Sequence, residues 1–186
     1  DRYLREHTFK LLERTAEALA EELLLHTEGL EKIRLEIKKP WAPVKLPLKT
    51  VSVEIERGWH TAYIALGSNM GDRKNYLDGA VKALSGLRGC SVTKVSRFLE
   101  TPPYGVTDQD DFLNACLELR TLLPPDELLE ELHRIEKAAG RERIVRWGPR
   151  TLDLDIIFYD DLISEKDSLC IPHVEMHKRK FVLEPL

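Results

Sequence analysis

Residues 146–155 carry the side chains with the clearest chemical potential in this chain. They read Arg-Trp-Gly-Pro-Arg-Thr-Leu-Asp-Leu-Asp and continue into Ile-Ile-Phe-Tyr, a β-branched and aromatic run typical of a strand. On an extended segment Asp153 and Asp155 point to one face, while Leu152 and Leu154 point to the other. Two carboxylates this close repel unless a cation lies between them. Mg²⁺ fits, because it takes one or two carboxylates and completes its shell with water and phosphate oxygens.

Basic side chains gather immediately before this pair of carboxylates. The guanidinium group binds phosphates and carboxylates through two parallel hydrogen bonds, so arginines beside a two-carboxylate metal site suit a polyphosphate substrate. The spacing alone leaves a second interpretation open, an edge strand with solvated aspartates next to a basic helix end. The basic residues are Arg134, Lys137, Arg141, Arg143, Arg146 and Arg150.

The elements that position these residues can be predicted from the periodicity of apolar side chains. A strand over residues 61–66 runs into Gly-Ser-Asn-Met-Gly, and Asp72 is placed to cap a helix over 73–87. Strands are expected over 92–98 and 113–121, then a helix opened by Pro124-Pro125 and a last strand over 151–159. This β-α-β-β-α-β order is that of the ferredoxin-like sandwich, so the fold class is α+β.

The first 58 residues show a separate pattern. Apolar positions recur at helical spacing from Thr8 to Leu25, alternate over 30–37, and alternate again over 51–55 beyond a proline-punctuated loop. One helix and two antiparallel strands cannot bury both of their faces, so we expect half of a larger domain over 1–58. A second domain would then cover 59–186. Because the chain lacks an initiator Met and stops within an apolar pattern, we expect it to be part of something longer.

Composition excludes several classes of function. The 186 residues are 42% hydrophobic and 32% charged, which is ordinary for a soluble globular protein. The net charge of −4 gives no sign of the basic surface that nucleic-acid binding requires. No apolar run reaches membrane-spanning length. Three widely spaced cysteines favour a reducing cytoplasm over a disulfide framework or a zinc site. We expect a cytoplasmic protein with neither nucleic acid nor membrane as a partner.

The string Arg-Trp-Gly-Pro-Arg-Thr-Leu-Asp-Leu-Asp-Ile-Ile resembles the signature of the 6-hydroxymethyl-7,8-dihydropterin pyrophosphokinase family of folate synthesis. The resemblance implies transfer of the β,γ-diphosphate of ATP to the pterin hydroxymethyl group with release of AMP. It implies two Mg²⁺ ions, held by Asp153 and Asp155, and no organic cofactor. Arg141 and Arg150 would share the catalytic role with the two aspartates. The ATP-binding residues would be Glu136, Arg141, Arg143, Trp147, Arg150, His173 and Arg179.

A proline-stiffened loop and an aromatic-x-Asn pair offer a site for a flat heterocycle. Prolines stiffen the loop, so that its backbone amides and carbonyls can bind a flat heterocycle. Phe112 offers a face for stacking, and Asn114, two residues on, points to the same side of the strand with a donor and an acceptor. On the residues alone, a proline-rich connection with a core phenylalanine remains the simpler interpretation. The resemblance favours a pterin site with the ring between Phe112 and Phe181. Its residues would be Thr101, Pro102, Pro103, Tyr104 (where the family often has Leu), Phe112, Asn114 and Phe181.

Two further motifs leave alternatives open. Gly67-Ser68-Asn69 lies between a strand and a helix, as either a phosphate-binding loop or a plain tight turn, and the pyrophosphokinase family carries the same three residues near its start. His173 and His177 lie four apart, a spacing that can ligate zinc on a helix. No acidic or thiol partner lies at fitting spacing, and the resemblance assigns His173 to the ATP phosphates instead.

Residues 1–58 resemble the second half of dihydroneopterin aldolase, an enzyme of the T-fold. Phe9-Lys10-Leu11-Leu12-Glu13 is similar to its pterin-anchoring helix, which implies that Glu13 grips the ring. Lys39, before Pro40-Trp41-Ala42-Pro43, matches the catalytic lysine. On the residues alone, both could be solvated surface charges.

The two resemblances together imply a bifunctional folate-synthesis protein. Its second activity would cleave dihydroneopterin to hydroxymethyldihydropterin and glycolaldehyde, and its aldolase part would assemble into a homo-oligomer. Two competing hypotheses remain at this point. One is a pterin- or nucleotide-binding module that keeps the fold without activity, and the other is an ATP-dependent phosphotransferase for another heterocycle.

Overall fold

A computed structural model describes residues 2–40, 49–103, 108–141 and 148–186. The chain divides into two compact units, Asp1–Trp59 and His60–Leu186, and each is described by itself. The described helices are all too short or too polar to cross a membrane.

The first unit consists of helices α1 (Arg2–Glu6) and α2 (Leu12–His26) and strands β1 (Lys32–Lys39) and β2 (Val51–Gly58). The strands pair antiparallel from Lys32 opposite Gly58 to Lys39 opposite Val51. Along both strands, half-buried apolar residues alternate with exposed polar ones. The polar face carries cross-strand ion pairs, such as Lys32 with Glu56 at 2.7 Å. The predicted helix and strand pair are therefore confirmed.

The N-terminal helix is shorter than the sequence predicted. We expected it to begin near Thr8, but α2 begins at Leu12 and Leu11 has an extended backbone. Phe9 lies beside Tyr3 and His7, with ring centroids 6.4 Å and 6.2 Å away. This aromatic contact holds the chain ahead of α2 in a non-helical path, which helical spacing alone could not reveal.

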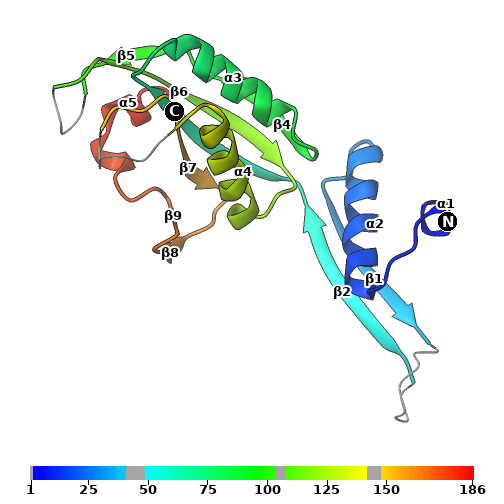
Figure 1. The fold of residues 1–186 in the computed structure, drawn as a ribbon. Helices are drawn as coiled ribbons and strands as arrows, with labels where there is room; N and C mark the ends of the chain where they lie inside the picture. Colours follow the sequence, from blue (N-terminus) through cyan, green and yellow to red (C-terminus); the bar gives the residue numbers. More distant parts are fainter. Residues whose placement is uncertain (1, 41–48, 104–107, 142–147) are drawn as a thin grey trace. The chain divides into compact units, whose positions relative to one another are not determined.

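The second unit is built around a five-stranded antiparallel sheet. Its elements are β3 (His60–Ser68), α3 (Arg73–Ser85), β4 (Cys90–Val95), β5 (Leu99–Thr101), β6 (Phe112–Thr121), α4 (Pro125–Ala138) and β7 (Asp153–Tyr159). The strand order is β4-β6-β3-β7, and the short β5 pairs with the start of β6. Figure 1 shows these strands with α3 and α4. With β5 left aside, this is the predicted ferredoxin-like β-α-β-β-α-β arrangement, which is confirmed.

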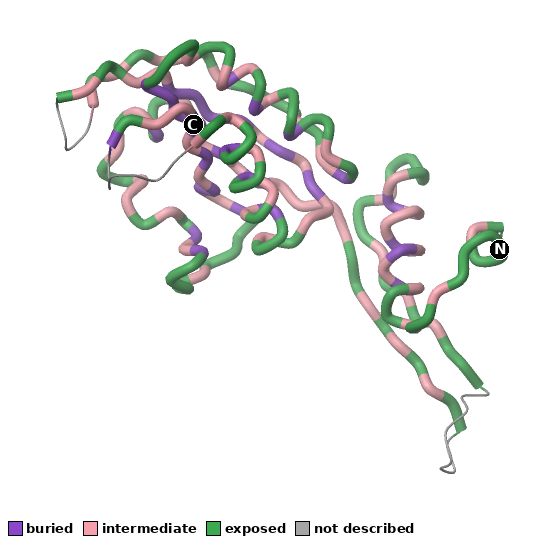
Figure 2. The backbone as a smooth tube through the Cα atoms, in the orientation of Figure 1, coloured by how far each residue is buried: buried purple, intermediate pink, exposed green. Residues whose placement is uncertain are grey.

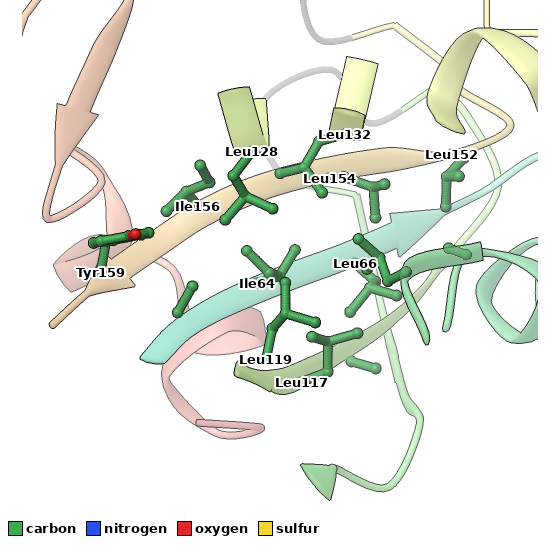
Figure 3. Close-up of a cluster of buried hydrophobic side chains, with 14 of the residues drawn as sticks. Ile64, Leu66, Leu117, Leu119, Leu128, Leu132, Leu152, Leu154, Ile156 and Tyr159 are labelled. Atoms are coloured by element: carbon green, nitrogen blue, oxygen red, sulfur yellow. The ribbon is translucent and has the colours of Figure 1, made fainter. Parts of the chain in front are cut away.

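The core lies between the sheet and the two helices. Figure 3 shows leucines of α4 and of strands β3, β6 and β7 meeting in this layer, and Figure 2 shows that burial is concentrated along these strands. The residues that form it include Ile64, Leu66, Leu77, Leu84, Leu117, Leu119, Leu128, Leu132, Leu152, Leu154 and Ile156. One face of the sheet is thereby fully used for packing, and the alternate side chains of each strand are left for the opposite face.

Local hydrogen bonds explain several element boundaries. The Asp72 carboxylate accepts a hydrogen bond from the Asn75 backbone N–H at 3.1 Å, which confirms the predicted cap of α3. Strand β4 ends at Val95, before the predicted limit of 98, because Ser96 turns inward and its hydroxyl accepts from the Cys116 N–H.

The sequence did not predict β5 or the elements that follow β7. These are β8 (Ser164–Lys166), β9 (Leu169–Ile171), the 3₁₀ turn η1 (Met176–Lys178) and α5 (Lys180–Leu183). Each has three or four residues, which is too short for a periodic pattern to develop.

Candidate active site

A pocket lies on the sheet face opposite α3 and α4, where β3, β6 and β7 meet the C-terminal segment. Most of the strand residues that line it occupy positions that alternate with the core residues, and Leu66, a core residue, also borders it, so the sheet itself is the floor. The lining residues are Ala65, Leu66, Gly67, Thr101, Pro102, Phe112, Asn114, Arg150, Asp153, Asp155, Arg179, Phe181 and Val182.

Strand β7 places two carboxylates in this pocket. Leu154 and Ile156 are buried in the core, so Asp153 and Asp155 point to the pocket face. The register against β3 then shifts, because Tyr63 pairs with Phe158 while Ile64 pairs with Ile156. The extra residue, Ile157, is a β-bulge next to the site, a common place for this irregularity.

Two arginines neutralise Asp153. The Arg141 guanidinium lies 2.6 Å from its Oδ1, and the Arg150 guanidinium lies 2.5 Å from its Oδ2. The positive charge expected beside the paired carboxylates is thus supplied at Asp153 by arginine side chains, in addition to the Mg²⁺ that the sequence favours.

Asp155 follows Asp153 on the same face of β7 and also lines the pocket. Burial and the neighbouring Asp153 charge raise the pKa of the Asp155 carboxyl, and the positive charges of His173, Arg179 and Arg141 act in the opposite direction. The ionised form of Asp155 is thus costly in the free protein, and a cation placed beside it would be strongly favoured.

Glu136, near the C-terminal end of α4, contacts both strand β7 and Arg141. Its side chain is 3% exposed, accepts a hydrogen bond from the Leu154 N–H at 2.8 Å and pairs with Arg141. Burial raises the pKa of Glu136 to about 7, against the opposing effects of the Leu154 hydrogen bond and the Arg141 charge. Glu136 therefore fixes both the β7 backbone and the Arg141 side chain.

The other end of the pocket combines an aromatic ring with an amide. Asn114 is buried, and its Nδ2 donates to the Thr101 hydroxyl at 2.9 Å, across the β5–β6 pairing that sets Thr101 opposite Phe112. A Cβ at Gly67 would come within 3.1 Å of the Asn114 Oδ1. The glycine therefore leaves room for this amide at the pocket floor.

The C-terminal segment closes the pocket. The His173 N–H donates to the Ile157 carbonyl at 3.1 Å, which ties the segment to the bulge of β7. Arg179 pairs with Glu175 at 2.6 Å, and its guanidinium lies 5.8 Å from the centre of the Phe181 ring. Phe181 and Phe112 both line the pocket, so two aromatic rings and a cationic group border the same space.

The remaining predicted site residues fall into three groups. Pro103 is described and half-buried, but it does not line the pocket. Glu13 is in the first turn of α2 and Lys39 ends β1; both are exposed and belong to the first unit. Tyr104, Arg143 and Trp147 lie outside the described residues, as does Arg146.

The zinc alternative gains no support from geometry. His173 precedes η1 and His177 lies within it, so the pair does not share a regular α-helix. Within the part of the chain that is described, no cluster of three or more His, Cys, Asp or Glu side chains could hold a metal ion.

Sequence reasoning missed the role of two residues in building the site, Gly67 near the end of β3 and Asn69 just after it. Gly67 and Asn69 were noted as part of a possible phosphate loop or turn, yet the structure places Gly67 in the pocket floor and buries Asn69 behind it. A glycine within a strand is a signal of close approach by another group, and it could have indicated the first.

Comparison with known proteins gives two family matches. Residues 63–186 match the model of 7,8-dihydro-6-hydroxymethylpterin-pyrophosphokinase, and residues 1–56 match that of dihydroneopterin aldolase. A 2-amino-4-hydroxy-6-hydroxymethyldihydropteridine pyrophosphokinase of Bacillus subtilis is 52% identical over 125 residues, which cover 67% of this chain and 75% of that protein.

Longer relatives are matched over a smaller share of their length. The bifunctional protein FolKE of Lactococcus lactis is 48% identical over 68% of this chain, a region that amounts to 36% of that protein. The folic acid synthesis protein fol1 of Pneumocystis carinii is 34% identical over 100% of this chain, which spans 27% of that protein.

Proposed function

Since the chain belongs to the 7,8-dihydro-6-hydroxymethylpterin-pyrophosphokinase family, as its sequence predicted, we propose that its second unit pyrophosphorylates a pterin. The substrates are ATP and 6-hydroxymethyl-7,8-dihydropterin, and the products are AMP and the pterin diphosphate. The observation that carries this proposal is the composition of one pocket, which joins aromatic and amide groups to carboxylates and arginines. The first group suits a pterin ring and the second a metal-bound triphosphate.

The donor set fits Mg²⁺. Asp153 and Asp155 present carboxylate oxygens from one face of β7, and the charges of three basic side chains act on Asp155. Mg²⁺ takes one or two carboxylates when substrate phosphates and water fill its other positions, so two carboxylates are sufficient. When bound, Mg²⁺ neutralises charge on the phosphate oxygens. We propose two ions with ATP, as in the family resemblance.

The protein's own residues would act mainly by positioning and by charge. Glu136 holds Arg141 and the β7 backbone, while Arg150 lies on Asp153. With ATP and Mg²⁺ bound, the guanidinium N–H groups that now meet Asp153 would be available to phosphate oxygens, where they stabilise developing charge, while Arg141 would keep its pair with Glu136. His173 and Arg179 would contact the phosphates from the C-terminal side, and Arg143 and Trp147 would complete the nucleotide site.

The pterin would lie between Phe112 and Phe181. Asn114 offers a donor and an acceptor to the ring edge, and its position is fixed by Thr101. Pro102 borders this space, and Pro103 and Tyr104, which follow it in the sequence, would contribute to the same site.

We further propose that residues 1–58 are part of a dihydroneopterin aldolase domain and residues 59–186 most of a pyrophosphokinase domain. The family match over residues 1–56 supports the first assignment. Glu13 would hold the pterin and Lys39 would act in the retro-aldol step of the complete domain. The homo-oligomer expected through this part, and a cytoplasmic location consistent with the free thiols of Cys90, Cys116 and Cys170, belong to the same proposal.

The proposed reaction is tested by the mass of the pterin product. With ATP and Mg²⁺ present, the pterin should gain the mass of two phosphoryl groups. A gain of one phosphoryl group would instead support a phosphotransferase of another type, and binding without any gain would support a module that has lost activity.

Replacing Phe112 with alanine should weaken pterin binding far more than ATP binding. Loss of one stacking face costs about 1–3 kcal/mol, by analogy with bases stacked on aromatic side chains. We expect the Kd for the pterin to rise roughly 10- to 100-fold, measured by titration calorimetry. Phe158→Ala is the matched control, because Phe158 packs against Tyr63 and does not line the pocket. Equal losses for both ligands in Phe112→Ala would place the pterin elsewhere.

Replacing Gly67 with alanine should perturb the same end of the pocket by a different route. The new Cβ would lie 3.1 Å from the Asn114 Oδ1 and 3.9 Å from the Phe112 ring, so the amide must shift from its bond to Thr101. Since one hydrogen bond is worth about 1 kcal/mol, we expect pterin affinity to fall about fivefold. Gly79→Ala on α3 meets nothing within 4 Å and should leave affinity unchanged. Unchanged affinity in Gly67→Ala would remove Asn114 from the proposed ring contacts.

A further inference from the structure

Glu175 is an acidic residue of the C-terminal segment to which the proposed reaction gives no role. In the sequence it lies between His173 and Arg179, the two residues of this segment proposed to contact the phosphates. A carboxylate near a polyphosphate repels it unless a cationic partner neutralises the charge. Glu175 does not line the pocket, whereas Arg179 does. The contacts of Glu175 therefore show what it holds in place.

The Glu175 carboxylate holds one end of the Arg179 guanidinium. Its Oε2 accepts a hydrogen bond from the Arg179 Nη2 at 2.6 Å, and the Arg179 side chain is only 17% exposed. This hydrogen bond and the Arg179 charge lower the pKa of Glu175, so the carboxylate is ionised at neutral pH. A charge-assisted bond that is partly shielded from water is stronger than a fully exposed ion pair.

The Arg179 side chain has other attractions within the pocket. Its charge acts on Asp155, where it opposes the rise in the pKa of that carboxyl. Its Nε is buried and has no hydrogen-bond partner among the described residues. Loss of the Glu175 contact would release this long side chain into several rotamers, with Asp155 attracting it. The contact to Glu175 therefore keeps the guanidinium in one orientation.

The backbone of Glu175 serves the other phosphate-side residue independently. Its N–H donates to the His173 Nδ1 at 3.3 Å, so a neutral His173 carries its hydrogen on Nε2, which remains a donor. The Met176 N–H donates to the His173 carbonyl at 3.0 Å, and the Lys178 N–H donates to the Glu175 carbonyl at 3.1 Å. A change of the Glu175 side chain thus alters the hold on Arg179 and leaves the contact to His173 in place.

We propose that Glu175 is a positioning residue that presents the Arg179 guanidinium to the phosphates of the nucleotide. The carboxylate takes one edge of the planar guanidinium group, and the remaining N–H groups keep a fixed direction. Fixing a flexible side chain before the ligand arrives reduces the entropy that binding must offset. This inference rests on the proposed function, since it needs a polyphosphate in the pocket.

A double-mutant cycle separates positioning from a general structural role. Glu175→Gln keeps the length of the side chain and removes its charge. Arg179→Ala removes the group through which Glu175 would act, and a variant with both changes completes the cycle. Asp78→Asn is the matched control, because Asp78 pairs at the same distance, 2.6 Å, with Lys74, four residues away on α3 and outside the pocket.

The experiment measures the Kd of the full chain for α,β-methylene-ATP in saturating Mg²⁺ by titration calorimetry. The methylene group of this analogue blocks the bond that the reaction would break. The Kd for the fluorescent analogue 6-hydroxymethylpterin, measured without nucleotide, reports whether the rest of the pocket is intact. Melting curves verify that each variant is folded.

Arg179→Ala should raise the Kd for the nucleotide analogue roughly 10- to 100-fold, the usual effect of losing a hydrogen bond to a charged group. Glu175→Gln should raise it about three- to tenfold, and Asp78→Asn should leave it within about twofold of wild type. In the Arg179→Ala background, Glu175→Gln should change it by less than about twofold, because the guanidinium is absent. The Kd for the pterin analogue should change by less than about twofold in Glu175→Gln, because the pterin makes no contact with the guanidinium that is released.

Three results would overturn the inference by itself. One is wild-type or tighter nucleotide binding in folded Glu175→Gln or Arg179→Ala. Another is an equal loss from Glu175→Gln with and without Arg179, which would show that Glu175 acts on the segment as a whole. The third is an equal loss of nucleotide and pterin affinity in Glu175→Gln.

The wild type separates this inference from the function on which it rests. A wild type that binds no nucleotide analogue would overturn the proposed function. If Glu175→Gln does not fold, Glu175→Ala enters the same cycle and decides between the same outcomes.

Discussion

Replacement of Asp155 by asparagine should reduce turnover by at least 10²–10³-fold while the protein stays folded. Asp155 is an electrostatic contact to the metal-bound triphosphate, and loss of one such contact costs about this factor in rate. Asp153→Asn should show a loss of the same order. Turnover is measured at saturating ATP and pterin, with Asp161→Asn, an exposed turn residue, as the control.

The two variants should differ in the stability of the free protein. Asp155 is an acid whose pKa is raised in the folded state, so its ionisation as the pH rises opposes folding. Asp155→Asn should therefore melt higher than wild type, and the difference should grow as the pH rises through the folded-state pKa. Asp153→Asn should melt lower, because Arg141 and Arg150 lose their common partner.

The turnover measurement decides the metal assignment. More than a tenth of wild-type turnover in either Asp155→Asn or Asp153→Asn would contradict it.

The second large effect is expected when the two units are produced as separate fragments, because only one of them should fold by itself. A fragment beginning at His60 should melt cooperatively and bind the nucleotide, because α3, α4 and the sheet enclose one leucine-rich core. Residues 1–58 alone should remain unfolded. In the described part of that unit, the buried apolar residues are Ala16, Ala18, Ala20 and Leu24, which is little for an independent core.

The sheet of the first unit gives the same expectation. It has two strands, β1 and β2, and a two-stranded pair is at best marginally stable by itself. Circular dichroism melts of both fragments, with an aldolase assay on the shorter one, provide the measurement. A cooperatively melting or active fragment of residues 1–58 would show that it is a complete domain.

Much of the fold followed from local patterns. Apolar alternation on β3, β6 and β7 and the helical stripes of α3 and α4 determined the β-α-β-β-α-β order, and Asp72 marked the start of α3. The alternation of Asp153 and Asp155 with buried leucines also placed both carboxylates on one face of β7. These features depend on residues near in sequence, so the sequence alone was sufficient.

Features that depend on distant pairing were not predictable in this way. The bulge at Ile157 arises from the register of β7 against β3. The hydrogen bond from the Arg150 backbone N–H to the Asn69 side-chain oxygen joins residues that are far apart in sequence. The aromatic contact of Phe9 with Tyr3 and His7 overrode helical spacing. The pairing of Asp153 with Arg141 and Arg150 was missed because a local pattern shows the repulsion of like charges but not their tertiary partners.

The identity of the nucleotide product tests the central claim most directly. The full chain is incubated with ATP, Mg²⁺ and 6-hydroxymethyl-7,8-dihydropterin, and the adenine nucleotides are separated by chromatography. The proposed pyrophosphoryl transfer predicts one AMP for each pterin consumed, no accumulation of ADP, and no AMP when either Mg²⁺ or the pterin is omitted. Formation of ADP in proportion to the pterin consumed, or no pterin-dependent nucleotide product at all, would contradict it.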